Sequence, residues 1–324
     1  MRNVGWLVAG ASALVIAGGA FVTAETVLVD GGLPAYQRVG GIAGNLNSVG
    51  SDTLNNLMTF WAEAFAKYYP NVKIQVEGKG SSTAPPALIA GTAQLGPMSR
   101  AMKSSEVDSF EKKYGYKPTA VAVALDALAV YVNKDNPIEQ LTIPQVDAIF
   151  SITRACGGPL NISNWSQLSL GPDWNQPISL YGRNSASGTY AYFKEHALCK
   201  GDFKSSVKEQ PGSATVIEGV TNDRHAIGYS GMGYKTASIR MVPLVPLAGT
   251  KAYEANQENV YAGSYPLSRY LYVYINKAPG QPLDPLIRNF LLYVLSKEGQ
   301  ETVVKDGFIP LTKEIVEVEL KKLQ

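Results

Sequence analysis

From about residue 45 onward, segments with the periodicity of helices alternate with segments that have the pattern of strands. Residues 53–68 carry apolar side chains three and four positions apart, so one face of a helix would be apolar. Residues 72–76 instead alternate between apolar and polar side chains, as a strand with one buried face does. The alternation predicts an α/β fold with mostly parallel sheets. Further helices are expected at 83–90, 105–114, 142–150, 188–198, 283–295 and 298–305, and further strands at 120–132, 178–181, 226–230 and 269–275.

Residues 1–24 have the composition of a secretory signal peptide. Arg2 gives a positive start, residues 6–21 are apolar and uncharged, and small residues precede Glu25. We therefore expect cleavage near Ala24 and a soluble, periplasmic mature protein. An uncleaved membrane anchor is the alternative, although the apolar run is slightly shorter than the about 20 residues of a membrane span.

The rest of the chain has a balanced charge and enough residues for two domains. The whole sequence has 29 basic and 27 acidic residues and contains no basic run, so we expect no binding to nucleic acid or to a membrane surface. The roughly 300 residues that follow the leader are enough for two hydrophobic cores.

The sequence contains two cysteines, Cys156 and Cys199. An even number of cysteines in an exported chain predicts a single disulfide between them. A catalytic thiol is the alternative, but the sequence has no Cys-x-x-Cys pattern that would support it.

Three turns that lead from a predicted strand into a predicted helix share one composition. They are residues 48–53, 78–83 and 182–189, and each combines glycine with serine or threonine. The first backbone N–H groups of a helix and the positive end of its dipole attract anions. Because such turns meet at the carboxyl edge of a sheet, the three turns together predict a site for a small oxyanion.

Two arginines accompany these turns. Arg183 lies in the third turn, and Arg100 ends a fourth segment, 95–100, that contains a Gly-Pro turn. A guanidinium presents two N–H groups that match phosphate or carboxylate oxygens. Each piece alone could be a helix cap or a solvated arginine. Their presence in one chain favours a shared anion site.

These segments resemble the ligand loops of the periplasmic phosphate-binding proteins of ABC importers. The matching residues are 48–53, 80–83, 96–100 and 183–189, in this order. The resemblance extends from about residue 45 to 310 and includes 228–230 and 306–310. Its most specific element is the pattern Arg-x-x-x-Ser-Gly-Thr at 183–189.

The resemblance implies a two-lobed Venus-flytrap fold of type II-like topology that closes over its ligand. Residues 128–133 would form the first hinge crossing, and 269–275 would return the chain to the first lobe. Residues 25–44 are rich in glycine and lack periodicity, which predicts a loose N-terminal arm. The resemblance implies lobe 1 at 45–132 plus 268–324 and lobe 2 at 133–267. The implied ligand is inorganic phosphate, and the implied partners are a membrane permease and its ATPase, with the binding protein itself a monomer.

The resemblance also implies how individual residues bind phosphate. Arg183 would form the charged pair, and lobe 2 would add donors from the hydroxyls and backbone N–H groups of the third turn. Lobe 1 would donate from the first and second turns. The expected phosphate-binding residues are Ser51, Asp52, Thr53, Ser81, Ser82, Arg100, Asp126, Arg183, Ser187, Gly188 and Thr189.

The two acids in this set replace acids that one branch of the family has elsewhere. That branch has an aspartate where this chain has Arg100, and an acid where this chain has Ser185. An acid that accepts the proton of phosphate separates it from sulfate, which carries none. We therefore expect Asp52 or Asp126 to take this role and hypothesise that Asp52 and Arg100 together keep the site near neutral. The alternative for Asp52 is an N-cap of its own helix.

Other functions require features that the sequence does not offer. A secreted phosphatase with a serine nucleophile needs a base, and the two histidines, His196 and His225, lie outside the turns. Histidine, cysteine and carboxylate residues also lack the spacing of a metal site. We expect no enzyme activity and no cofactor. Binding of another oxyanion, such as sulfate, molybdate or a phosphonate, remains an alternative because the same donors would serve.

Overall fold

A computed structural model describes residues 27–158 and 160–324, so the predicted signal peptide lies outside the described residues. Within them, no helix has both the length and the apolar character to span a membrane. The helices are α1 Asn55–Tyr68, α2 Ala84–Ala90, α3 Ser104–Tyr114, α4 Ile143–Phe150, α5 Gly188–His196, α6 Ser213–Asn222, α7 Gln257–Tyr261, α8 Pro285–Val294, α9 Lys297–Lys305 and α10 Lys313–Lys321.

The strands are mostly short, apart from one that runs the length of both halves of the molecule. This long strand is β4, Thr119–Asn133. The others are β1 Gly44–Val49, β2 Val72–Glu77, β3 Gly96–Met98, β5 Leu141–Thr142, β6 Ser179–Arg183, β7 Lys208–Gln210, β8 Ala226–Gly231, β9 Ile239–Met241, β10 Leu244–Val245 and β11 Ser268–Ile275.

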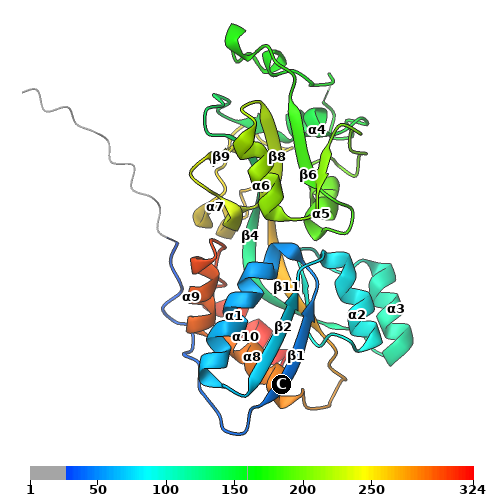
Figure 1. Cartoon of the computed structure of the whole chain (residues 1–324), viewed down its shortest axis with the longest axis vertical. Helices are drawn as coiled ribbons and strands as arrows, with labels where there is room; N and C mark the ends of the chain where they lie inside the picture. Colours follow the sequence, from blue (N-terminus) through cyan, green and yellow to red (C-terminus); the bar gives the residue numbers. More distant parts are fainter. Residues whose placement is uncertain (1–26, 159) are drawn as a thin grey trace, which may run out of the picture.

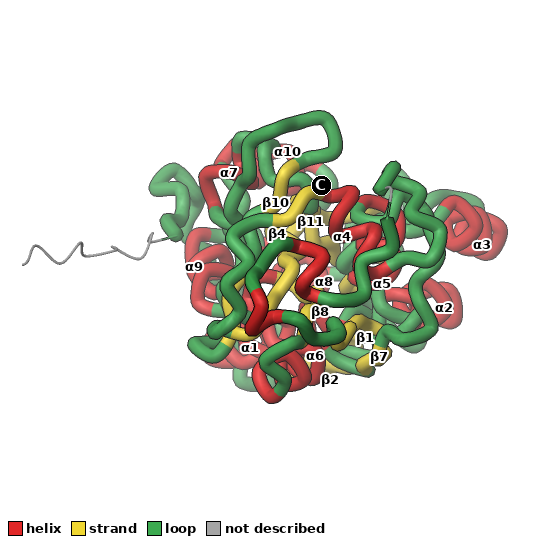
Figure 2. Tube along the Cα trace, turned by 90° about the horizontal axis from the view of Figure 1, so that it is seen from above, coloured by secondary structure: helices red, strands yellow, loops and turns green. Residues whose placement is uncertain are grey.

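The chain folds into two lobes joined by β4 and β11, as Figure 1 shows. The lower lobe of that view holds β1, β2, α1, α2, α3 and α8 to α10, and the upper lobe holds β6, β8 and α4 to α6. Seen from above in Figure 2, the strands lie in the middle and helices surround them. The predicted two-lobed α/β fold is confirmed.

β4 connects the lobes because its two halves pair with different strands. Residues 119–127 pair with β11, and residues 128–132 pair with β8 of the upper lobe. The seven-stranded sheet has the order β3-β11-β4-β8-β6-β7, and β9 also pairs with β4. Thirteen consecutive residues of β4, from Val121 to Asn133, are buried, which fits a strand covered on both faces.

The expectation of mostly parallel sheets is wrong for the centre of the molecule. β1 and β2 are parallel, as are β6, β7 and β8. The pairs that β4 makes with β8, β9 and β11 are antiparallel, as is the pair of β11 with β3. The reason is topological: β4 leaves the lower lobe and β11 returns to it, so the two strands run in opposite directions.

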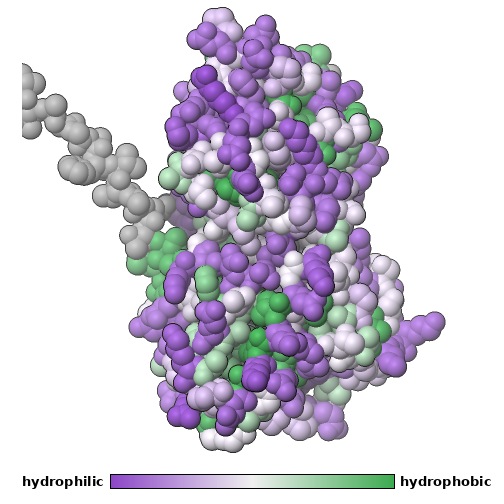
Figure 3. Space-filling model, in the orientation of Figure 1, coloured by the Kyte–Doolittle hydropathy of each residue, from purple (hydrophilic) through white to green (hydrophobic). Residues whose placement is uncertain are grey.

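The apolar face predicted for 53–68 forms the core of the lower lobe. Leu57, Met58, Trp61 and Phe65 are fully buried on α1. The indole N–H of Trp61 donates to the carbonyl of Gly299 on α9 at 2.8 Å, so the largest of these side chains is buried with its polar group satisfied. Figure 3 shows the consequence, a surface on which hydrophilic residues cover most of the visible face.

The composition of the arm before β1 predicted a loose segment, but the structure shows the arm packed against the lower lobe. Residues 27–43 contain no helix or strand, yet Leu33 and Tyr36 are buried against the lower lobe. The hydroxyl groups of Tyr36 and Tyr69 lie 2.9 Å apart. Aromatic anchors therefore hold the arm although its backbone lacks a repeating pattern.

The predicted disulfide is confirmed. Cys156 and Cys199 are bonded, with their Cα atoms 5.3 Å apart. The bond ties the loop that follows α4 to the residues just after α5 in the upper lobe.

Candidate functional site

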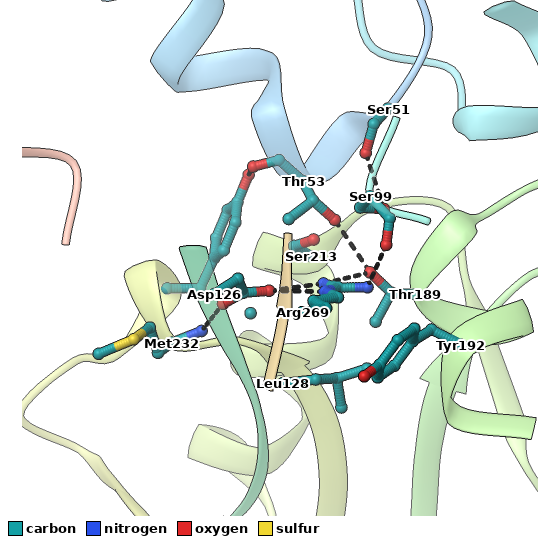
Figure 4. A network of polar contacts seen from close by, with 12 residues as sticks. Ser51, Thr53, Ser99, Asp126, Leu128, Thr189, Tyr192, Ser213, Met232 and Arg269 are labelled. Atoms are coloured by element: carbon teal, nitrogen blue, oxygen red, sulfur yellow. Dashed lines mark hydrogen bonds and ion pairs between the residues drawn. The ribbon is translucent and has the colours of Figure 1, made fainter. Parts of the chain in front are cut away.

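The first two turns and the fourth segment meet through their hydroxyl groups in the lower lobe. The hydroxyl of Ser51 donates to that of Ser99 at 3.0 Å, and the hydroxyls of Ser81 and Ser99 lie 3.3 Å apart. Across the lobes, the hydroxyls of Thr53 and Thr189 lie 3.0 Å apart. We call these five residues the hydroxyl cluster, part of which Figure 4 shows. All five are buried.

Backbone bonds hold these segments in register. β1 and β2 are parallel, so both end at the same edge of their sheet. Beyond that edge, the N–H of Ser51 donates to the carbonyl of Pro97 at 2.8 Å, and the N–H of Gly80 donates to the carbonyl of Gly50 at 2.8 Å. The predicted convergence of turns at a sheet edge is therefore present in the lower lobe.

The third turn brings the N-terminus of α5 from the upper lobe onto the same cluster. Ser187 caps this helix, because its hydroxyl oxygen accepts from the N–H groups of Thr189 at 3.1 Å and Tyr190 at 3.4 Å. Gly188 lies so close to the lower lobe that an added Cβ would be 2.6 Å from the Ser99 hydroxyl oxygen and closer still to that of Ser81. Only glycine lets the backbone of α5 approach these two serine side chains so closely.

Three hydroxyls, two of the cluster and that of Ser187, already accept hydrogen bonds, so their protons must point away from these donors. Ser187 accepts the two N–H groups of α5, Ser81 accepts the N–H of Ser99 at 3.0 Å, and Thr189 accepts from Arg269 at 3.0 Å. A hydroxyl that accepts from the protein keeps its proton for donation. Ser81, Thr189 and the neighbouring Ser187 therefore keep their protons for donation, which suits a deprotonated oxygen.

Arg183 lies at the end of β6 and is buried. One terminal nitrogen donates to the Ser213 hydroxyl at 2.6 Å and lies 3.1 Å from Oδ1 of Asp52. Burial lowers the pKa of Arg183, while Asp52 acts in the opposite direction. Its Nε is buried and has no hydrogen-bond partner within the described part of the chain. An unpaired buried N–H is costly, and an anion oxygen would satisfy it.

The alternative role for Asp52, as the N-cap of its own helix, is not observed. Instead its Oδ1 accepts the N–H of Ser213, the first residue of α6 in the other lobe, at 2.7 Å. Its Oδ2 takes part in none of the hydrogen bonds found in the described part of the structure. The side chain is 22% exposed, so Asp52 bridges the lobes and keeps one oxygen free.

Arg100 and Ser82 lie at the edge of the cluster. Both terminal nitrogens of Arg100 bind the carboxylate of Glu106 at 2.7 Å, and one is 3.3 Å from the Ser82 hydroxyl. Burial acts to raise the pKa of Glu106, but its bonds to Arg100 and to the Lys103 backbone lower it overall. The positive charge of Arg100 is thus matched by Glu106. The hypothesised balance of Asp52 against Arg100 is not formed, because Asp52 pairs with Arg183.

Asp126, the second candidate acid, is fully buried and has both oxygens occupied. Oδ1 accepts the N–H of Met232 at 3.0 Å, and Oδ2 accepts two N–H groups of Arg269 at 2.9 and 2.7 Å. Figure 4 shows Arg269 between Asp126 and Thr189. The structure therefore brings Asp126 to the cluster only through an arginine.

Sequence reasoning missed Arg269 and Ser213. Arg269 is the one charged residue of β11, and every residue after it in this strand is apolar or aromatic, a signal that could have drawn attention to it. Ser213 begins a helix, α6, that was not predicted at all. Its position after Pro211-Gly212 is the only local sign of a helix start.

The lobes contact each other directly around this site. The N–H of Ser82 donates to the carbonyl of Ala186 at 3.1 Å, and the hydroxyl of Tyr234 donates to the carbonyl of Asp52 at 3.0 Å. In the described ranges, histidine, cysteine and carboxylate side chains form no group that could hold a metal ion. The arrangement can surround a small anion with neutral and charged donors.

Comparison with known proteins gives a consistent result. A family model described as a PBP superfamily domain matches residues 37–298. The phosphate-binding protein PstS of Pseudomonas aeruginosa is 58% identical over 309 residues, which cover 95% of this chain and 96% of that protein. Protein SphX of Synechococcus elongatus is 29% identical and covers 81% of this chain and 76% of its own length.

Solved structures agree in fold. The phosphate-bound crystal structure of a protein described as a phosphate ABC transporter substrate-binding protein from Clostridium perfringens has a TM-score of 0.70 at 27% identity, covering 83% of this chain and all of its own. An ABC-type phosphate transport receptor from Vibrio cholerae shares the fold with a TM-score of 0.62 at 22% identity, covering 82% of this chain and 100% of its own.

Proposed function

Because this chain belongs to the PstS phosphate-binding proteins of the PBP superfamily, we propose that it binds inorganic phosphate in the periplasm and delivers it to an ABC importer. The observation that carries the proposal is the cluster of buried donors between the lobes. Hydroxyls of both lobes lie within hydrogen-bond distance there, and their protons are directed away from the protein groups that they accept from.

We assign phosphate binding to three groups of residues. Arg183 supplies the positive charge, and its unpartnered Nε is the N–H that a phosphate oxygen would accept. The N-terminus of α5 contributes through Ser187, Gly188 and Thr189. The lower lobe contributes through Ser51, Thr53 and Ser81, while Ser82 and Arg100 border the site without being its main donors.

Asp52 is the acid that accepts the proton of phosphate in this proposal. Its Oδ2 is free of protein hydrogen bonds, whereas both oxygens of Asp126 are occupied by Met232 and Arg269. A carboxylate with a free oxygen attracts a protonated phosphate oxygen and repels a sulfate oxygen.

The proposed motion is a hinge closure about β4 and β11. We place lobe 1 at 45–132 plus 268–324 and lobe 2 at 133–267, because β4 changes partners from β11 to β8 near residue 128. The permease would engage the closed form of a monomer. Binding is the whole of the proposed activity, since neither histidine of the sequence belongs to the site.

Isothermal titration calorimetry of the mature chain with phosphate, sulfate and arsenate tests this function directly. We expect tight binding of phosphate between pH 6 and 8 (about neutral, where phosphate keeps a proton) and far weaker binding of sulfate. Equal affinity for phosphate and sulfate, or no binding of phosphate, would contradict the proposal. A colorimetric phosphatase assay on the same sample tests the enzyme alternative.

Asp52→Asn tests the acid. The substitution keeps the shape and the acceptor for Ser213, but it loses the charge beside Arg183. We expect phosphate affinity to fall and the ratio of phosphate to sulfate affinity to fall by about tenfold or more. Asp126→Asn is the matched comparison and should change this ratio less. Unchanged affinities for both ions in Asp52→Asn would exclude Asp52 as the acid.

A further inference from the structure

Arg269 is a buried cation whose hydrogen bonds extend in three directions. Its Nε and one terminal nitrogen bind Oδ2 of Asp126, which lies directly opposite on β4. The same terminal nitrogen donates to the Thr189 hydroxyl at 3.0 Å, and the other donates to the Ser99 carbonyl at 2.9 Å. Four of its five N–H groups are thus assigned to protein acceptors.

These partners belong to both lobes and to the hinge. Ser99 comes from the lower lobe, Thr189 from α5 of the upper lobe, and Asp126 from β4. Asp126 itself holds the upper lobe through the N–H of Met232. The ring of Tyr192, also on α5, lies 5.5 Å from the guanidinium carbon. Arg269 therefore contacts the upper lobe at the helix that begins in the site, as Figure 4 shows.

The bond to Thr189 has a specific effect on the hydroxyl cluster. Because the guanidinium donates to the Thr189 oxygen, the hydroxyl proton of Thr189 must point elsewhere, toward Thr53 or a bound anion. A guanidinium cannot reverse this direction, since it has no acceptor. Thr189 is thereby kept as a donor.

Arg269 also separates the cluster from a groove between the lobes. The groove has a volume of about 870 Å³ and is bordered by Arg100, Tyr190, Tyr192, Arg269 and Tyr272 among others. The side chain of Arg269 is only 2% exposed although it lines this groove. Its removal would bring water close to Thr189, and water weakens every hydrogen bond to a dehydrated anion.

We infer that Arg269, oriented by Asp126, is a positioning residue of the anion site that fixes Thr189 as a donor and closes the site against the groove. This inference rests on the proposed phosphate binding. It assigns to the hinge strand β11 a direct part in affinity, in addition to its part in joining the lobes.

The test is a double-mutant cycle between Arg269 and Thr189, read by calorimetry with inorganic phosphate and by the phosphate dissociation rate. We expect Arg269→Gln to weaken phosphate binding by about tenfold or more, through faster dissociation. In a Thr189→Val background, Arg269→Gln should reduce phosphate affinity clearly less, because the hydroxyl that Arg269 positions is already absent. Arg269→Lys keeps the positive charge but loses the planar set of N–H groups of the guanidinium, so we expect an intermediate loss of phosphate affinity.

Two further variants separate positioning from stability. Arg269→Gln leaves Asp126 as an unpaired buried charge, which destabilises folding. Asp126→Asn/Arg269→Gln removes both charges and should recover stability without recovering affinity. Arg240→Gln is the matched control, because Arg240 is a partly buried arginine that bonds to the carbonyls of Asn136 and Ile138 away from the site. It should bind phosphate like the wild type.

The outcomes distinguish the two levels of the argument. Wild-type protein that fails to bind phosphate refutes the proposed function. If the wild type binds phosphate, and a folded Arg269→Gln, Arg269→Lys or double variant binds it with equal affinity, the role of Arg269 is refuted. The proposed function then stands. Additive losses in the cycle with Thr189→Val would also overturn it, because positioning through Thr189 requires coupling.

Discussion

Gly188 is the point where the upper lobe comes closest to the hydroxyls of the lower lobe, and Gly188→Ala tests whether this closed arrangement is the one that binds. The added Cβ would lie 2.6 Å from the Ser99 hydroxyl oxygen and 2.9 Å from the Ser81 Cβ. Ordinary contact begins at 3.4 Å. Both serines are fully buried, and hydrogen bonds with Ser51 and with the N–H of Ser99 hold their hydroxyls in place. The contact with the Ser81 hydroxyl oxygen would be shorter still, so the lobes must separate by about 1 Å at this point.

A separation of this size removes hydrogen bonds that close the site. The hydroxyls of Thr53 and Thr189, now 3.0 Å apart, would pass beyond hydrogen-bond range. Each charge-assisted hydrogen bond to phosphate that is lost costs roughly 1.5–3 kcal/mol. With two such bonds weakened, we expect the affinity for phosphate to fall by about 100-fold or more.

The same substitution should not destabilise the protein without ligand. Gly188 is the first residue of α5 and has an ordinary helical backbone, so alanine there is tolerated and stabilises the helix by up to about 1 kcal/mol. Calorimetry with phosphate and thermal unfolding without it measure the two effects. Gly249→Ala is the control, because its Cβ would meet no atom closer than 3.5 Å. Wild-type affinity in Gly188→Ala would refute the closed arrangement as the binding state.

Three other variants test separate features. Replacing both Cys156 and Cys199 by serine removes a cross-link between residues 43 positions apart, so we expect the free energy of unfolding in urea to fall by ~4 kcal/mol while phosphate binding is retained. An unchanged urea midpoint would contradict this. Burial raises the pKa of Asp306 to about 7 from 3.8, so the folded state keeps a proton that the unfolded chain releases, and stability falls as the pH rises through that window. Asp306→Asn should therefore be more stable than the wild type at pH ~8 by on the order of 1–2 kcal/mol after solvent screening, and equal to it at pH ~4; parallel stability profiles would exclude this. Glu106→Gln leaves the charge of Arg100 unmatched, so the ratio of sulfate affinity to phosphate affinity should rise by about threefold to tenfold in competition titrations. An unchanged ratio would show that Arg100 does not act on the site.

The sequence predicted the parts of the site that depend on local pattern. Glycine and hydroxyl residues at strand-to-helix turns, such as Ser51 and Ser81, were found because helix N-termini and sheet edges impose these residue types. The buried face of α1 and the disulfide followed from periodicity and composition. The turns and the buried face of α1 are each encoded within a few residues, and the disulfide needed only the count of cysteines.

Features that depend on the approach of distant segments were missed. The pairing of Asp52 with Ser213 joins residues 161 positions apart, and that of Asp126 with Arg269 joins residues 143 apart. No local sequence pattern specifies which carboxylate pairs with which distant hydrogen-bond donor. The antiparallel centre of the sheet was missed for the same reason, because the direction of β11 relative to β4 follows from how the chain returns between the lobes.

The three arginines around the site each have a carboxylate partner, and the location of these partners gives them different tasks. Arg100 pairs with Glu106 inside the lower lobe, and Arg269 pairs with Asp126 between hinge strands. Only the pair of Arg183 with Asp52 joins one lobe to the other. Opening the lobes therefore separates one ion pair and leaves the other two intact. In the proposed function, a phosphate that enters the open site would meet Arg183 as a free cation and Asp52 as a free acceptor, and closure would bring both onto the ligand. The paired Arg100 and Arg269 keep the surroundings near neutral, so affinity depends on hydrogen-bond geometry more than on net charge. Within the proposed function, this division would let the site select a protonated oxyanion although an arginine, Arg100, follows the serine of the fourth segment.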